Sequence, residues 1–113
     1  MSWQQINDPD QFTNDILDND QIHLVFKHSP RCGISKMVLR RFENFDFYQT
    51  SEIQFWLLDV LNSRHISNSI AAQFNIRHES PQILVIKNRK LLHHSSHSAI
   101  EAEEINNIIS NWQ

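Results

Sequence analysis

Hydrophobic positions along this chain follow two spacings, one typical of buried strands and one typical of amphipathic helices. Three short, almost continuously apolar runs at residues 22–28, 53–60 and 82–86 indicate buried strands. Asn88-Arg89 then predicts a hairpin turn from the third run into a fourth strand at about 90–95. The pattern therefore predicts a sheet of four strands.

Apolar residues at three- and four-residue steps predict helices around these strands. The first helix covers about 9–18, because Asp8 followed by Pro9 is typical of a helix start. A second helix follows Cys32 and carries one apolar stripe. We expect this stripe to be buried, and it consists of Ile34, Met37, Val38, Phe42 and Phe45.

Two further helices are predicted in the second half of the chain. Ser63 is expected to cap one that runs through Phe74. Ser98 and Glu101 have the spacing of a capping box and predict the start of the last helix. The apolar stripe of this last helix is Ile105, Ile108, Ile109 and Trp112.

The predicted order of elements is α-β-α-β-α-β-β-α. The strand–helix–strand unit at 22–60 should be parallel and right-handed, and the late hairpin should add antiparallel strands to the same sheet. Helices would then cover both faces. The pattern thus predicts an α/β, thioredoxin-like fold with a central four-stranded mixed sheet, formed by residues 1–113 as a single domain.

Composition narrows the classes of function. A single cysteine excludes an internal disulfide and favours a reducing, cytoplasmic compartment, and the polar N-terminus shows no secretory signal. The longest apolar run, Phe55–Leu58, is far shorter than the roughly 20 residues that span a bilayer, so no membrane association is expected. A net charge of −3 gives no general attraction to nucleic acid.

Candidate chemistry lies in the stretch "SPRCGISK", which contains the only cysteine, Cys32, beside the only glycine, Gly33. The predicted layout places Cys32 between a strand and a helix N-terminus, where free backbone N–H groups and the helix dipole favour the thiolate. Arg31 and Lys36 act in the same direction. Gly33 leaves room for a partner's backbone. The alternative reading is an inert buried cysteine, with Gly33 merely easing the bend.

Two neighbouring features fit thiol chemistry. Ser35 stands three residues after Cys32, where it can donate a hydrogen bond to the thiolate but cannot close a disulfide, so the site is monothiol. A plain first-turn helix residue is the alternative for Ser35. Pro81 opens the third strand, and a cis Ser80–Pro81 bond is predicted there, with the backbone before it exposed for pairing with a substrate peptide.

The stretches "KHSPRCGIS", "RHISNSIAAQFNIRHESPQI" and "HSSHSAI" resemble the bacillithiol-system redox-active proteins of the YtxJ type, over residues from about 10 to 110. The resemblance implies a cytosolic bacterial protein of monothiol, bacilliredoxin-like type that exchanges thiols with bacillithiol, a small thiol bearing a sugar and malate. It makes Cys32 the nucleophile, Ser35 the non-resolving partner and Pro81 the cis-proline. Family members often carry proline where this chain has Gly33.

Two functions remain open at this stage. The first is a monothiol oxidoreductase that removes bacillithiol or a similar small thiol from S-thiolated proteins through an adduct on Cys32. It would work as a monomer with no bound cofactor, using the thiol as co-substrate. The residues expected to contact the substrate are Arg31, Gly33, Lys36, Ser80 and Pro81.

The second function is a non-catalytic thioredoxin-fold module that holds a protein partner at the cis-proline edge. The pH dependence of Cys32 alkylation separates the two, because a thiol that reacts only above about pH 8 favours the binding module. A metal site is not expected, since the clustered His93, His94 and His97 lack the spacing of zinc ligands.

Overall fold

A computed structural model describes residues 2–47 and 53–112 of the chain. Its sheet contains five strands in the order β1-β3-β2-β4-β5. The first three strands along the chain run parallel, and the last two are antiparallel to their neighbours. The strands are β1 (Gln4–Gln5), β2 (Ile22–His28), β3 (Ile53–Asp59), β4 (Gln82–Lys87) and β5 (Lys90–Ser96).

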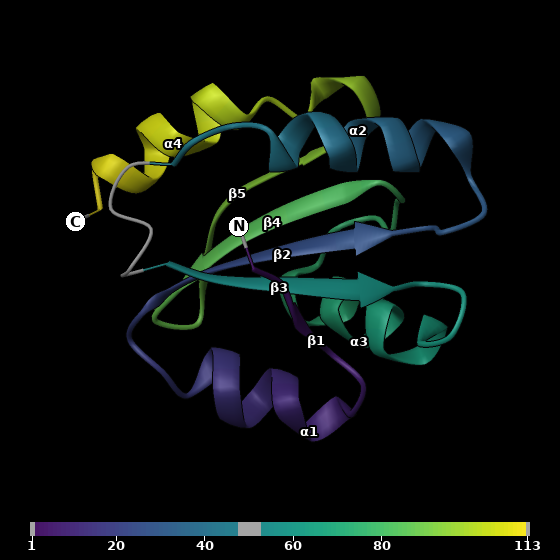
Figure 1. Ribbon diagram of the computed structural model, residues 1–113. Helices are drawn as coiled ribbons and strands as arrows, with labels where there is room; N and C mark the ends of the chain where they lie inside the picture. Colours follow the sequence, from purple (N-terminus) through teal and green to yellow (C-terminus); the bar gives the residue numbers. More distant parts are fainter. Residues whose placement is uncertain (1, 48–52, 113) are drawn as a thin grey trace.

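Helices cover both faces of this sheet (Figure 1). One face carries α2 (Gly33–Glu43) and α4 (Ala102–Ser110), and the other carries α3 (Arg64–Phe74) and the N-terminal helix. Successive side chains of the central strands point to opposite faces of the sheet, so each face has its own apolar cluster. The predicted α/β, thioredoxin-like layout is confirmed, with five strands in place of four.

The additional strand is β1, which pairs in parallel with β3 through Gln4 opposite Trp56 and Gln5 opposite Leu57. Its two residues are polar and exposed. They offer no alternation of apolar and polar positions, and their partner lies about fifty residues away along the chain. Local pattern therefore gives no signal for this strand.

The N-terminal helix begins where the sequence predicts. Asp8 accepts a hydrogen bond from the backbone N–H of Asp10, and Gln11 Oε1 accepts one from the N–H of Asp8, which completes a capping box. A short α-helix, α1 (Pro9–Gln11), then widens into a π-helical segment over Phe12–Leu17. The widening leaves three apolar side chains of that segment buried.

The predicted buried stripe of α2 is wrong at its first two positions. Ile34 and Met37 are 58% and 57% exposed. The inward positions are taken by Ser35, Val38 and Phe42 instead. Adjacent residues of a helix point about 100° apart, so Ser35 and Ile34 cannot both face the sheet. The hydrogen bonds of Ser35 described below decide the orientation.

The predicted start of α4 is also wrong. Ser98 lies in a separate 3₁₀ turn, η3 (His97–Ala99), and Glu101 occupies the N-cap position of α4 without a capping hydrogen bond. Between them, Ile100 is buried in an extended conformation. Burial of this apolar side chain interrupts the helix that the capping pattern predicts. Trp112, the last residue of the predicted stripe, lies beyond α4 and is half exposed.

Two other turns agree with the sequence. Asn88 and Arg89 both have positive φ, at 52° and 64°, which is the backbone of a type I′ hairpin turn. Ser63 occupies the N-cap position of α3, although its side chain makes no capping hydrogen bond. The hairpin turn lies beside the start of β2, because His23 pairs with Ile86, whereas the end of β2 lies beside the start of β4.

Candidate active site

Cys32 lies at the junction between β2 and α2. It is the N-cap residue of α2, with extended φ and ψ of −96° and 121°, and its side chain makes no capping hydrogen bond. Its carbonyl oxygen accepts the N–H of Lys36 and so begins the helix. The thiol is free and the residue is half-buried. The sulfur therefore lies at the start of the helix and makes no capping hydrogen bond to it.

The loop before Cys32 is a tight turn. The N–H of Cys32 donates to the carbonyl oxygen of Ser29 over 3.1 Å, with Pro30 at the second position of the turn. Serine first and proline second are typical of such turns, since proline already has the required φ. The four residues bring the chain from the end of β2 directly into α2.

The turn that holds Cys32 has positively charged groups near it. The first N–H groups of α2 have no partner within the helix, and the helix dipole places positive potential at this end. Arg31 and Lys36 are exposed on either side of the turn. These groups place positive charge around the turn that holds Cys32.

Gly33 has no packing or backbone requirement for glycine. A Cβ built at this position would meet nothing within 4 Å, and the φ of Gly33 is not positive. The residue is exposed. The space that a Cβ of residue 33 would take is open, so neither packing nor the backbone angle requires glycine at this bend. The approach of a partner's backbone past Gly33 stays a prediction.

Ser35 makes the best-defined contacts of the site. It is completely buried. Its Oγ accepts the N–H of Ser29 over 3.0 Å and lies 2.8 Å from Nδ1 of His28. Ser35 thus joins the end of β2, the loop and the first turn of α2. It is more than a plain first-turn helix residue.

The loop that leads into β4 reaches the same end of the sheet. Lys27 lies opposite Gln82 in the β2–β4 register, so Pro81 lies next to the point where β2 ends. Pro81 is buried, and the predicted cis Ser80–Pro81 bond is present. The carbonyl oxygen of Pro81 accepts the N–H of His97. The sheet topology therefore brings this proline and the Cys32 loop to the same end of the two neighbouring strands β2 and β4. Contact of these residues with a substrate remains a prediction.

A buried polar chain on the α3 side was missed by sequence reasoning. Lys27 is completely buried, and its Nζ donates to the carbonyl oxygen of Ser67 over 3.1 Å. Ser67 Oγ lies 2.8 Å from Nδ1 of His78. Burial, and then the charge of Arg64, lower the pKa of Lys27 to about 8. Lys27 is therefore a buried cation whose hydrogen-bond partner lies on α3.

The pKa values of the two histidines near this end of the sheet, His28 and His78, are both lowered. Burial is the main reason that the pKa of His28 and that of His78 lie below the usual 6.5. For His78, the charges of Lys27 and Arg64 lower the pKa further. Both imidazoles are therefore neutral at pH 7.

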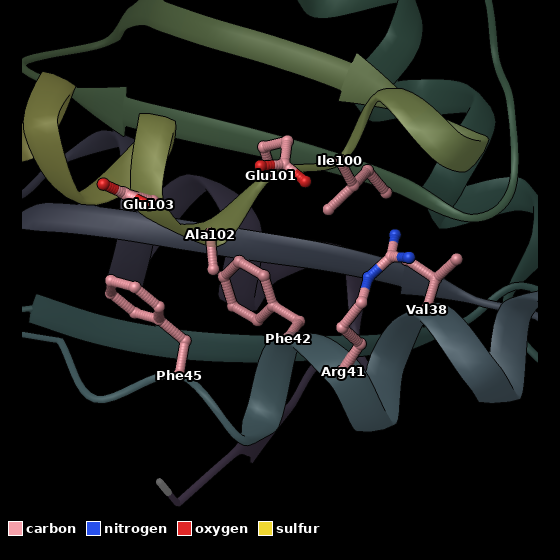
Figure 2. Close-up of a pocket in the computed structure, with 8 residues that line it drawn as sticks. All are labelled: Val38, Arg41, Phe42, Phe45, Ile100, Glu101, Ala102 and Glu103. Atoms are coloured by element: carbon pink, nitrogen blue, oxygen red, sulfur yellow. The ribbon is translucent and has the colours of Figure 1, made fainter.

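A separate hollow lies between the second half of α2 and the start of α4 (Figure 2). Apolar side chains, among them Phe42 and Ile100, line it, and Arg41 and Glu101 lie at its border. Cys32 is not among the lining residues. The hollow is thus distinct from the junction of β2 and α2.

The described part of the chain contains neither a metal-ligand cluster nor a membrane-spanning helix. Across residues 2–47 and 53–112, no group of three His, Cys, Asp or Glu side chains is arranged to hold a metal ion. No helix within those ranges has the length and apolar character needed to cross a membrane.

Comparison with known proteins agrees with this geometry. Residues 4–105 match the protein family described as "Monothiol bacilliredoxin BrxC". A solved structure described as a candidate oxidoreductase with a thioredoxin fold is 28% identical and superposes with a TM-score of 0.80, over 93% of this chain and 91% of that one.

Two thioredoxins share the fold at lower identity. The thioredoxin of Malassezia sympodialis is 22% identical with a TM-score of 0.73, over 97% of this chain and 90% of its own. The thioredoxin of Trypanosoma brucei brucei is 18% identical with a TM-score of 0.71, over 98% and 90%. These likenesses establish the thioredoxin fold.

Proposed function

This chain belongs to the monothiol bacilliredoxin family, and from this premise we propose that it removes bacillithiol, or a similar small thiol, from mixed disulfides on proteins. The observation that carries the proposal is the placement of Cys32. The free, half-buried thiol stands at the N-cap of α2 with no hydrogen bond to the helix. A thiolate at a helix start is the form that attacks a disulfide sulfur.

In the first step, the Cys32 thiolate attacks the bacillithiol sulfur of the mixed disulfide. A new S–S bond forms between Cys32 and bacillithiol, and the bond between bacillithiol and the target protein breaks. The target sulfur leaves as a thiolate and takes up a proton from water. The number of disulfide bonds is unchanged, so this step needs no outside oxidant or reductant.

In the second step, another thiol must release the adduct. Cys32 is the only cysteine in the chain, and Ser35 stands where a resolving thiol would be. A second thiolate, such as free bacillithiol, attacks the bacillithiol sulfur of the adduct. Cys32 is regenerated and a small-molecule disulfide leaves, so the protein acts as a monothiol carrier.

Substrate binding is assigned to the groups around the Cys32 turn. Arg31 and Lys36 are exposed cations beside the sulfur, and they suit the carboxylates of a malate-bearing thiol. Gly33 leaves the approach open. The backbone of Ser80, before cis-Pro81, offers strand-like pairing to the modified protein. We place the reaction in the bacterial cytoplasm, where small thiols are reduced.

Intact-mass spectrometry tests the proposal. The protein is mixed with a target that carries one bacillithiol in mixed disulfide, and both masses are followed over time. We expect one bacillithiol to move to Cys32 while the target regains its free thiol. Added bacillithiol should then return the protein to its starting mass.

Cys32→Ala is the matched control, and it should leave the target modified. The proposal fails if the wild-type protein gains no adduct and the target keeps its bacillithiol. Retained binding of the target by Cys32→Ala, together with an inactive wild type, would identify the non-catalytic binding module instead.

A further inference from the structure

A band of apolar surface runs along one side of α2, from its start at Cys32 to the hollow beside α4. Ile34 and Met37, in the first two turns of the helix, are 58% and 57% exposed. Val38 and Arg41 line the hollow, and each stands four residues after one of these two, so it lies on the same side of the helix. The two exposed side chains therefore lead from the cysteine to the hollow. We call Ile34, Met37 and the hollow the apolar band.

The hollow has the size to take one apolar side chain. Its volume is about 190 Å³. A cavity of about 150 Å³ with an apolar lining accepts a benzene ring. The apolar lining is supplied by the buried Val38, Phe42 and Ile100 and by the half-buried Phe45 and Ala102. A leucine or phenylalanine side chain of a partner therefore fits the hollow.

The border of the hollow carries charges of opposite sign on its two sides. Arg41 extends from α2, and Glu101 and Glu103 stand on the α4 side (Figure 2). All three residues are exposed. Among the described residues, none of these three side chains is in an ion pair. A partner in the hollow thus finds a free cation on the α2 side and free carboxylates on the α4 side.

The charge between Cys32 and the hollow is positive. Arg31 and Lys36 are exposed there, and residues 27–41 contain no acidic residue. Cations of one sign attract an acidic partner and repel a basic one. A partner segment that approaches from the cysteine toward Arg41 is therefore favoured when it carries an acidic residue.

We propose that the apolar band is a docking site for the thiolated protein itself, which places a large apolar side chain in the hollow and an acidic residue beside Arg41. The proposal rests on the proposed function, in which the modified cysteine of the target reacts at Cys32. It goes further, because it names the kind of protein segment that is recognised. Met37 suits this role, since its flexible side chain adapts to different partners.

The length of the band sets the spacing in the target. Arg41 lies nine residues after Cys32, which is about 14 Å along the helix axis. An extended chain covers that distance in about four residues. The apolar residue of the target should therefore stand about four residues from the modified cysteine. A small disulfide has no segment that reaches the hollow, so the band would select proteins.

A peptide titration followed by NMR of the backbone amides tests docking without any sulfur exchange. The probe carries serine in place of the modified cysteine, and a leucine followed by an aspartate about four residues to either side of it. With the wild-type protein, we expect saturable shifts at Met37, Arg41 and Ala102. A second peptide, with glycine in place of leucine, should not saturate. Shifts that do not saturate with the leucine peptide overturn the proposal.

Filling the hollow is the first variant test. In Ala102→Leu the larger side chain takes the space that the partner's leucine would enter, so we expect the affinity for the leucine peptide to fall by at least about fivefold. Ala72→Leu is the matched control, because Ala72 is an exposed alanine of α3 on the other face of the sheet. Its affinity should equal that of the wild type. An affinity that Ala102→Leu leaves unchanged overturns the proposal.

A charge exchange is the second variant test, and it changes only an exposed residue. Arg41→Glu should weaken binding of the aspartate peptide by about two- to fivefold, the size of an exposed ion pair. A peptide with lysine in place of aspartate should bind Arg41→Glu better than it binds the wild type. Equal losses for both peptides overturn the pairing with Arg41.

The remaining outcomes separate this proposal from its alternatives. If the same amides shift with protein concentration alone, a second copy of the chain covers the hollow and the docking site for a target is wrong. The titration uses no bacillithiol. Saturable peptide binding with a target that stays modified supports the docking site and refutes the proposed function. A target that is cleared, without peptide binding, refutes the docking site and leaves the proposed function in place.

Discussion

Lys27 donates through Nζ to the carbonyl oxygen of Ser67 over 3.1 Å. This hydrogen bond joins the second-to-last residue of β2 to α3. The Lys27 side chain is completely buried, and its pKa is lowered to about 8, mainly by burial. A lysine charge held in a protein interior opposes folding unless its partners fully replace water. The contact therefore positions β2 against α3 at the expense of stability.

We predict that Lys27→Met stabilises the fold at pH 7 by about 1–3 kcal/mol. Between the folded pKa of about 8 and the unfolded value of 10.5, the unfolded chain binds more protons, so the wild type gains stability as pH rises through this window. Below pH 8 both states carry the charge and the full penalty applies. The advantage of Lys27→Met should therefore shrink between pH 7 and pH 10 in urea unfolding.

Lys36→Met is the matched control, because Lys36 is an exposed lysine on α2. Its effect on the free energy of unfolding should be small and nearly the same at both pH values. A loss of stability in Lys27→Met that is equal at pH 7 and pH 10 would contradict the prediction.

Lys27 also illustrates what sequence pattern can and cannot provide. The apolar run around it predicts β2 correctly, because a continuous run of this length is typical of a strand buried on both faces. The burial of Lys27 itself depends on Ser67, forty residues further along the chain. No local pattern of residues carries that information.

The candidate site was predictable to a similar extent. The positions of Cys32 and Pro81 follow from the order of strands and helices, since both stand at ends of neighbouring strands. The inward orientation of Ser35 does not follow from hydrophobicity, which favours Ile34 for that place. It depends on hydrogen bonds to His28 and Ser29, and these appear only when β2 and α2 are packed together.

Gly33→Pro should stabilise the protein by about 0.5–1 kcal/mol. Position 33 is the first residue of α2, where proline is favoured, and the Cys32 before it is already extended, as the residue preceding a proline must be. The open space around Gly33 leaves room for a ring. Urea unfolding measures the change.

Gly33→Ala separates the two sources of the stabilisation expected for Gly33→Pro, which are the loss of glycine's freedom in the unfolded chain and the fixed φ of proline. It reduces the freedom of the unfolded chain without fixing φ, so it should stabilise by a smaller amount than proline. Destabilisation by Gly33→Pro would mean that this backbone does not begin a helix in the way described.

Ser35→Ala should destabilise the fold by about 1–3 kcal/mol. The change leaves the N–H of Ser29 without its acceptor and removes the contact of His28, in a place closed to water. Ser69→Ala is the control, because Ser69 is an exposed serine within α3. Its cost should stay within about 0.5 kcal/mol in the same chemical denaturation assay. Equal costs for the two variants would count against the buried hydrogen bonds.

Arg31→Gln should slow the reaction of Cys32 with an anionic small disulfide more than with a neutral one. Arg31 is an exposed cation directly before Cys32, so its field raises the local concentration of anions at the sulfur. Any effect of the charge on the reactivity of the thiol itself is common to both reagents. The ratio of the two rate constants, anionic over neutral, should therefore fall by about two- to fivefold at low salt.

Salt provides the internal check on this last prediction. The screening length shortens from about 30 Å at 0.01 M to about 3 Å at 1 M salt, so the wild-type and Arg31→Gln ratios should converge as salt is added. Arg40→Gln is the matched control, since Arg40 is an exposed arginine of α2, about 10 Å further along the helix axis. Its ratio should stay close to the wild type. A ratio that falls equally in both variants would show a general charge effect and not a role for Arg31 beside the sulfur.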